Sequence, residues 1–254
     1  MTLEDATIRL AAVLPPLRIR HGVSVLCYHE ICQQASNSDG RFVVSVAALR
    51  RHLTIVRRSG RAVVQRPDST RIVDRAVMIT FDDNLPSHVS HALPVLREAE
   101  VPAMFFLNPG ELGDRQQLSR RDVDTLIDAG MFIGAHGFRH TLVHTIDPAD
   151  FVQDVRRCAA FLHSLDMPLT WAFPGGHIGS FTSIHDQILQ DHGFDVRFST
   201  LEGIYHSGIR ARVHGRYVIR RDSSDTYVEA AVSGGLQLLR VAKRIRVMAA
   251  ASFS

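Results

Sequence analysis

The sequence contains two short groups of side chains whose types could together bind a metal ion. Asp82 and Asp83 follow one apolar run, and His136 and His140 stand four positions apart after another. Two histidines at this spacing can face the same side of one helical turn and share a metal. Each group alone has a simpler explanation, because paired acids often begin turns and this chain has 14 histidines. Only their combination favours a metal site.

One carboxylate and two histidines form a frequent ligand set for a catalytic divalent metal. Such a set leaves coordination positions open, and the metal lowers the pKa of a bound water towards about 7. Adjacent side chains at the end of a strand point apart, so one aspartate can bind the metal while the other accepts a proton from that water. The residues therefore predict metal-assisted hydrolysis.

Apolar runs alternate with amphipathic stretches along the chain, and these elements must position the polar side chains. We expect strands at residues 23–28, 62–64, 77–81, 103–107, 132–135, 170–173, 196–199 and 217–220. We expect helices at residues 46–58, 87–99, 119–129, 148–165 and 183–190, and a mostly helical segment from residue 225. About seven such βα units predict an α/β fold with a parallel sheet and helices outside. Catalytic side chains in such folds lie at the carboxyl ends of the strands.

Polar residues also follow other predicted strands. His29 and Glu30 come after the strand at residues 23–28, and the segment PGGH (174–177) comes after the strand at residues 170–173. We weigh a structural and a pocket role equally for His29, and we expect Glu30 at the surface. Trp171 is the only tryptophan, and it could either stack on a sugar face or pack in the core.

These motifs resemble the polysaccharide deacetylase family, which is the nodulation-deacetylase homology class or carbohydrate esterase family four. TFDD at residues 80–83 resembles the family signature, and HGFRH at residues 136–140 resembles its H-x-x-x-H motif. The YH pair at residues 28–29, the segment at 92–107 and the sequence AFPGG at 172–176 resemble further family segments in the same order. The resemblance covers residues 23–220.

The resemblance implies a distorted (β/α) barrel, commonly with seven parallel strands and with helices outside. It implies that Asp83, His136 and His140 bind a divalent metal, usually Zn²⁺, and that Asp82 is the general base. It implies that the backbone N–H of Gly175 polarises the acyl carbonyl, which requires that it point at the developing oxyanion. The expected substrate contacts are His29, Trp171, Pro174 and His177.

The sequence departs from the family pattern in four respects. Gly137 stands where a serine or threonine often follows the first histidine of the H-x-x-x-H motif. Asn84 stands where TFDD is usually followed by glycine, and the arginine that often precedes the Pro-x-Gly loop is missing. The late Leu-x-His motif, which supplies a general acid in many members, is not visible. The remaining candidates for that acid are His177, His206, His214 and Asp82 after it has taken up a proton.

Composition excludes several classes of function. Of the 254 residues, 45% are hydrophobic and 22% charged, as in ordinary globular proteins. No apolar stretch approaches the roughly 18–20 residues of a membrane span, and 29 Lys+Arg against 26 Asp+Glu give no argument for nucleic acid. Three cysteines without motif spacing suit a reducing compartment. Because no signal peptide is evident, we expect a cytoplasmic location.

We divide the chain into an N-terminal helical extension (1–22), a barrel (23–222) and a C-terminal basic amphipathic helix (223–254). Residues 230–254 contain no acid but include Arg240, Lys243, Arg244 and Arg246. Such a helix can lie on an anionic membrane surface. We favour the alternative that it packs its apolar face on the barrel, and peripheral membrane contact remains the second interpretation.

The leading hypothesis is a metal-dependent N-deacetylase that acts on an N-acetylated amino sugar of a surface polysaccharide, glycolipid or oligosaccharide. One alternative keeps the chemistry but changes the substrate to a formylated lipid-linked sugar or a small cyclic amide. Another is a catalytically silent glycan-binding barrel, suggested by the absent Leu-x-His motif. The retained Asp82 argues against it, because a binding module needs no base beside a metal. The sequence indicates no oligomeric state.

Overall fold

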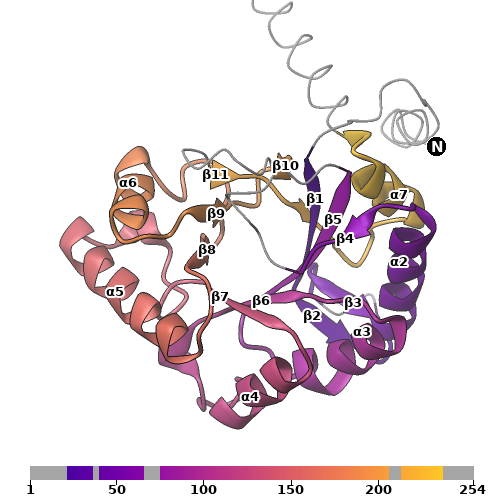
Figure 1. Cartoon of the computed structure of the whole chain (residues 1–254), viewed down its shortest axis with the longest axis horizontal. Helices are drawn as coiled ribbons and strands as arrows, with labels where there is room; N and C mark the ends of the chain where they lie inside the picture. Colours follow the sequence, from indigo (N-terminus) through magenta and orange to yellow (C-terminus); the bar gives the residue numbers. More distant parts are fainter. Residues whose placement is uncertain (1–21, 37–39, 66–74, 206–212, 237–254) are drawn as a thin grey trace, which may run out of the picture.

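The computed structural model describes residues 22–36, 40–65, 75–205 and 213–236. Within these ranges, ten strands form the main sheet, which curves into a nearly closed barrel with helices outside (Figure 1). They are β1 (Val23–Tyr28), β4 (Ala62–Val63), β5 (Ala76–Asp82), β6 (Met104–Leu107), β7 (Phe132–Ala135), β8 (Thr170–Ala172), β9 (Val196–Phe198), β10 (Ile204–Tyr205), β11 (Val213–His214) and β12 (Tyr217–Val218).

The order of the strands in the sheet is β10-β1-β5-β6-β7-β8-β9-β11, with β12 also paired to β1 and β4 to β5. Neighbouring strands are parallel, apart from the antiparallel pair of β1 and β10. The predicted α/β barrel and each of its predicted strands are therefore confirmed. The strands β10 and β11 were not predicted, because two residues are too few to show an alternating pattern.

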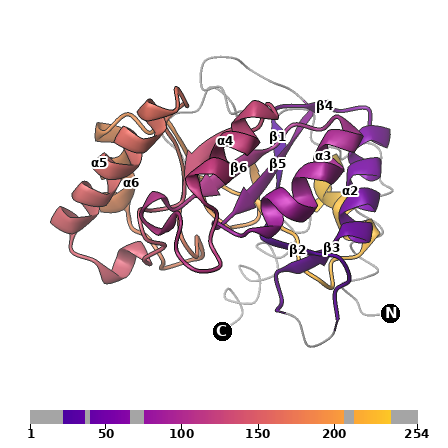
Figure 2. The same cartoon turned by 90° about the horizontal axis from the view of Figure 1, so that it is seen from below.

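A second, two-stranded parallel sheet pairs β2 (Glu30–Cys32) with β3 (Val43–Ser45). It was not predicted either. Figure 2 shows it at one end of the barrel, close to helices α2 (Val46–Arg58) and α3 (Leu93–Ala99). Because β2 directly follows β1, this small sheet lies at the carboxyl end of the barrel strands.

The helices begin where the sequence supplies capping side chains. Helix α2 has the predicted bounds, and Ser45 Oγ accepts a hydrogen bond from the Ala48 N–H at 3.1 Å. Helix α4 (Arg120–Asp128) begins with a capping box between Ser119 and Asp122. The other predicted helices form as α5 (Pro148–Ser164), α6 (Ser183–Asp191) and α7 (Asp225–Ser233).

The helix predicted at residues 87–99 has two parts. A π-helical turn, η2 (His88–Ala92), precedes α3, and the Leu93 N–H donates to the carbonyl oxygen of His88, five residues back. Pro94 lies in the first turn of α3 and has no N–H to continue the regular pattern. The break therefore has a local cause that the apolar periodicity did not reveal.

Strand side chains alternate between two apolar clusters. In β1, Val23 and Val25 belong to the cluster inside the barrel, whereas Leu26 and Tyr28 belong to the larger cluster between sheet and helices. Both faces of the strand are fully buried. Such two-sided burial explains why the strands read as continuous apolar runs.

Helix α7 belongs to the helix layer of the barrel. Arg51 Nε on α2 lies 3.1 Å from Asp225 Oδ2, and Ser24 Oγ on β1 donates to the Val232 carbonyl oxygen at 3.4 Å. The basic residues at 240–246 and the extension at 1–21 lie outside the described residues, so their predicted roles stay predictions. No helix within the described ranges has the length and apolar character needed to cross a membrane.

Candidate active site

The carboxyl ends of the barrel strands surround a cavity of about 490 Å³. It is lined by His29, Phe42, Asp82, Asp83, His136, His140, Gly175, His177, Thr200, Val218 and Arg220. Its size is typical of small-molecule sites. The fold thus brings most of the predicted site residues to one place, although they come from strands far apart in the sequence.

Asp83, His136 and His140 form a group that could hold a metal ion. One potential ligand atom from each lies within 4.8 Å of the other two. Oδ1 of Asp83 is 3.5 Å from Nε2 of His136 and 3.2 Å from Nε2 of His140. This oxygen is buried and has no hydrogen-bond partner, which costs about 1–3 kcal/mol in a folded protein. A cation between the three atoms would satisfy it.

His136 is held in the form that binds metals. Its Nδ1 lies 2.8 Å from the Ala172 carbonyl oxygen, which can only accept, so Nδ1 carries the hydrogen and Nε2 presents a lone pair. Burial lowers the pKa of His136, against the opposing effect of Asp82 and Asp83. A neutral imidazole whose lone pair faces a carboxylate oxygen fits a metal between them.

The two other ligand candidates differ in burial and share a strained backbone. Burial alone would raise the pKa of Asp83, but the neighbouring side chains of His140 and His136 lower it to about 2. Asp83 has a φ of 74° and His140 a φ of 48°, a left-handed conformation that few residues other than glycine adopt. Such strain is frequent at functional sites, where surrounding contacts hold the backbone.

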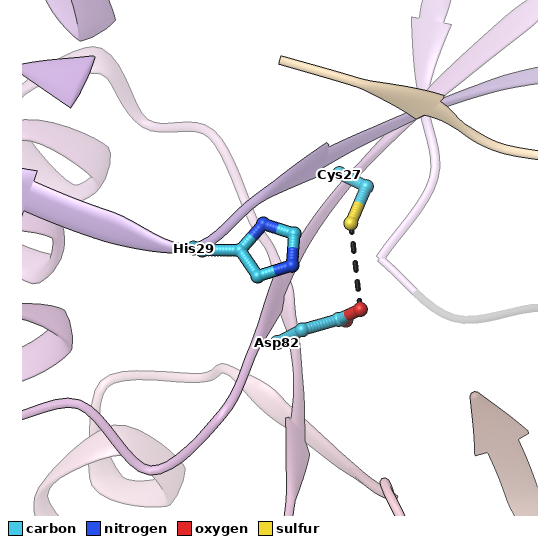
Figure 3. Close-up of side chains that lie close together, drawn as sticks. All are labelled: Cys27, His29 and Asp82. Atoms are coloured by element: carbon cyan, nitrogen blue, oxygen red, sulfur yellow. Dashed lines mark hydrogen bonds between the residues drawn. The ribbon is translucent and has the colours of Figure 1, made fainter. Parts of the chain in front are cut away.

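Asp82 is held as a carboxylate by a buried arginine. Nη1 and Nη2 of Arg216 donate to Oδ1 and Oδ2 of Asp82, both at 2.6 Å, and both side chains are almost fully buried. The thiol of Cys27 also donates to Oδ2, at 3.4 Å (Figure 3). Burial alone would raise the pKa of Asp82, but the Arg216 guanidinium outweighs it and holds the pKa below its usual range.

Arg216 was not predicted as a site residue. It precedes a short strand as one charged residue in HGRYVIR, and nothing nearby signals a partner 134 positions away.

Asn84, the departure from the family's glycine, joins the ends of two strands. Its Nδ2 donates to the Asn108 carbonyl oxygen at 2.7 Å, and its Oδ1 accepts from the Asn108 N–H at 2.9 Å. Asn108 Nδ2 in turn donates to the carbonyl oxygens of His136 and, at 3.3 Å, of Gly137. Both asparagines are buried. This network fixes the backbone that carries two of the candidate metal ligands.

The Asn108→Ala variant is expected to bind zinc about 10–100-fold more weakly than the wild type. Groups that hold metal ligands in place typically contribute this much affinity, and alanine removes both hydrogen bonds to the turn after β7. Competition with a chromogenic chelator measures the affinity, and urea unfolding of the metal-free proteins separates a local effect from general destabilisation. Equal zinc affinity in both proteins would contradict the role assigned to the network.

The loop after β8 forms one wall of the cavity. Thr200 Oγ1 donates to the Gly175 carbonyl oxygen at 2.7 Å, and the Thr200 N–H donates to that of Gly176 at 2.9 Å. A Cβ atom on Gly176 would lie 2.7 Å from the Thr200 nitrogen, so this close approach requires glycine. Gly175 and His177 line the cavity, whereas Pro174, also predicted as a substrate contact, is buried and is not among the lining residues.

His29 lies beside the carboxylate of Asp82. Figure 3 shows its ring next to Asp82 and Cys27, and potential ligand atoms of the three residues lie within 4.8 Å of one another. The ring stacks on Phe42 with centroids 4.9 Å apart, and its Nδ1 is buried without a hydrogen-bond partner. His29 is therefore a pocket residue, whereas Glu30 is exposed as expected.

The structure does not support the predicted roles of Trp171 and His214. The prediction that Trp171 contacts substrate is wrong: the side chain is fully buried, with ring centroids 5.7 Å from Phe151 and 5.4 Å from Phe194. Trp171 faces the helices because its neighbour Ala172 faces the barrel interior. Of the candidate acids, His214 is buried against Tyr205 rather than lining the cavity, and residue 206 lies outside the described ranges.

Comparisons with known proteins concern the family and the fold of the chain. A family model described as polysaccharide deacetylase matches residues 71–196, about half of the chain. No match is found among curated proteins. Among solved structures, IcaB from Ammonifex degensii is similar with a TM-score of 0.71 and 24% identity, covering 84% of this chain and 97% of its own.

Two further structures resemble the fold at lower identity. The Streptococcus pyogenes deacetylase PplD, solved with acetate, has a TM-score of 0.72 and 16% identity over 84% of this chain and 99% of its own. A de-N-acetylase from Aggregatibacter actinomycetemcomitans has a TM-score of 0.72 and 17% identity over 82% of this chain and 99% of its own. At these identities the likeness concerns the fold. With the family match and the motifs at residues 80–83 and 136–140, it shows that the chain belongs to the polysaccharide deacetylase family, whose reaction is carbohydrate de-N-acetylation.

Proposed function

We propose that this protein is a metal-dependent hydrolase that removes the N-acetyl group from an amino sugar of a surface polysaccharide, glycolipid or oligosaccharide, with Asp82 as general base. The observation that carries the proposal is the pairing of two adjacent carboxylates with different surroundings. Asp82 is held as an anion by Arg216, while the next residue, Asp83, faces His136 and His140. Two carboxylates in different environments can take separate roles in one reaction.

Asp83, His136 and His140 would hold the metal. Nitrogen and carboxylate ligands with open positions suit Zn²⁺. A divalent metal bound there supplies a Lewis acid and a water of lowered pKa. The buried, unpartnered Asp83 Oδ1 and the neutral His136 Nε2 support this assignment.

The hydrolysis needs one proton acceptor and one proton donor from the chain. Asp82 takes a proton from the attacking water while the oxygen of that water adds to the acyl carbon. The Gly175 N–H donates to the carbonyl oxygen while negative charge develops there. When the C–N bond breaks, the amine nitrogen must gain a proton. We assign its delivery to His29, which was not among the acids considered from the sequence, because it lines the cavity with its ring beside Asp82. The products are acetate and the free amino sugar.

The test combines metal analysis with an acetate assay on the full chain. Wild-type protein loaded with zinc should hold about one metal per chain and release acetate from N-acetylglucosamine oligomers. Asp83→Asn and His140→Ala should lose both metal and activity, since each removes a ligand. His29→Gln should keep the metal and lose about 10²-fold or more in rate. Exposed His163 provides a matched control, His163→Gln, which should change neither.

Other outcomes would contradict parts of the proposal. Full zinc content in both ligand variants would show that the ligand set is wrong. Metal binding without acetate release, but with formate release from an N-formylated sugar, would favour the deformylase alternative. Zinc binding with no acyl release from any amide substrate would favour a silent glycan-binding barrel.

A further inference from the structure

One cation in the cavity is unaccounted for by the reaction. Arg220 and Val218 line the cavity from the same side of the extended chain, while Ile219 between them is buried. The Nε of Arg220 is itself buried and makes no hydrogen bond. Among the described residues, no carboxylate forms an ion pair with its guanidinium. A buried donor without a partner is rare enough in native structures to need an explanation.

The backbone around Arg220 is held in place. Its N–H donates to Ser223 Oγ at 2.9 Å, and the Ser223 N–H donates back to its carbonyl oxygen at 3.0 Å. The next residue, Arg221, donates its N–H to the Arg41 carbonyl oxygen at 3.0 Å, which brings the segment containing Phe42 alongside. The guanidinium therefore extends into the cavity from a fixed point, as expected of a binding residue rather than a mobile surface side chain.

The charges of the cavity leave Arg220 uncompensated. The two carboxylates that line the cavity already have neighbours of their own. Asp82 is paired with Arg216, and Asp83 faces the side chains of His136 and His140. A bound divalent metal would add further positive charge. A cavity of this composition attracts an anion.

The guanidinium of Arg220 has the charge and the shape needed to bind an oxyanion. The planar fork of arginine suits a carboxylate or phosphate, which can accept two parallel hydrogen bonds.

We propose that Arg220 binds an oxyanion of the substrate, and that the preferred substrate is an anionic N-acetylated glycan rather than a neutral one. The oxyanion is a carboxylate of a neighbouring sugar or a phosphate on the glycan. This inference rests on the proposed function for its substrate class. It can be tested separately, because binding of the oxyanion needs no hydrolysis.

The binding experiment uses paired sugars that carry no acetamide group and so cannot react. Calorimetry compares cellobiuronic acid with cellobiose for the carboxylate, and glucose 1-phosphate with methyl glucoside for the phosphate. It is carried out on metal-free and zinc-loaded full chain, so that binding of an anion to the metal is recognised. We expect the wild type to favour an anionic sugar over its neutral partner by about tenfold or more in both states, as a charge-assisted bidentate pair allows.

The variants decide whether Arg220 is responsible. Arg220→Met should lose the preference, and Arg220→Lys should keep part of it because lysine retains the charge without the fork. Arg221→Met is the matched control: this neighbour is exposed, its guanidinium donates to the Ser36 carbonyl oxygen, and the preference should persist. If Arg220→Met does not fold, the preference for the anionic sugar is compared between Arg220→Lys and Arg221→Met. A weaker preference in Arg220→Lys alone would still show that Arg220 is responsible.

The outcomes separate this inference from the proposed function. A preference that disappears only in the Arg220 variants supports it, and the sugar pair that shows the preference identifies carboxylate or phosphate. Equal binding of both members of each pair, or a preference that survives Arg220→Met, overturns it. Acetate release is measured in parallel from a hyaluronan tetrasaccharide and from chitotetraose. Absence of acetate from both would refute the deacetylase proposal while leaving the binding result to stand.

Discussion

The Asp82→Asn variant is expected to keep its bound zinc and to release acetate about 10²–10⁴-fold more slowly than the wild type. A positioned general base contributes roughly this factor to a rate. The amide of asparagine cannot take a proton from water, but it keeps the size of the side chain and leaves Asp83, His136 and His140 untouched. Initial rates of acetate release and zinc content, measured on the same preparation, test the prediction.

The control for this variant is Asp128→Asn. Asp128 lies exposed near the end of helix α4, so its substitution should leave the rate unchanged. Thermal unfolding must accompany the assay, because the neutral side chain at position 82 no longer balances Arg216. Undiminished activity in Asp82→Asn would show that another group is the base, and loss of zinc would show that Asp82 also contributes to the metal site.

The Arg216→Met variant is expected to lose about 3–5 kcal/mol of unfolding free energy at neutral pH. Removing one partner of a buried ion pair leaves the other charge uncompensated, and this is typically the cost. The Asp82 carboxylate is 1% exposed and accepts both strong hydrogen bonds of the guanidinium. Without them burial should raise the pKa of Asp82, so acetate release should fall as well.

The effect should depend on pH in a definite direction. In the wild type the pKa of folded Asp82 lies below that of the unfolded chain, about 3.9. The pair therefore stabilises the fold above that pH, and its contribution disappears as the pH falls through the folded-state pKa. In Arg216→Met the pKa of folded Asp82 is raised instead. The free-energy cost of burying Asp82 without its partner therefore becomes smaller as the pH falls. Urea unfolding should show a smaller difference between the two proteins at pH 5 than at pH 7.

A double variant distinguishes loss of the ion pair from simple loss of packing. Asp82→Asn/Arg216→Met buries no unpaired charge and should be more stable than Arg216→Met alone. If both proteins lose the same stability, the arginine contributes through its packing on Phe106 and Phe198, whose ring centroids lie 5.3 and 6.0 Å from its Cζ.

Local features of the sequence were enough to predict where the strands lie and which residues form the candidate metal-binding group, Asp83, His136 and His140. The strand at residues 76–82 reads as one apolar run because both of its faces are buried, and Asp82 and Asp83 stand where it ends. The carboxyl ends of parallel strands meet at one end of a barrel. A motif at the end of β5 and another after β7 could therefore be placed together without coordinates.

Other features could not be read from the sequence, for identifiable reasons. The run WAF at residues 171–173 is apolar throughout, so no alternation shows which of its side chains faces the helices. The register of β8 decides this, and a shift by one residue would reverse it. For that reason the sequence left both roles of Trp171 open, and its place among the expected substrate contacts was wrong. Strands of two residues, such as β10 and β11, carry too few positions for any pattern.

The sequence by itself determined the α/β class with a parallel sheet, the positions of its main elements and the group of Asp82, Asp83, His136 and His140, because these depend on periodicity and on motifs within a few residues. The closure of the sheet into a barrel was implied only by the family resemblance. Only the tertiary structure decided that Arg216 holds Asp82, that Asn108 supports the turn after β7, and that Arg220 enters the cavity unpaired. The first two of these contacts join residues separated by 134 and 28 positions. They follow from how the strands close into a barrel, which no local pattern of residues encodes.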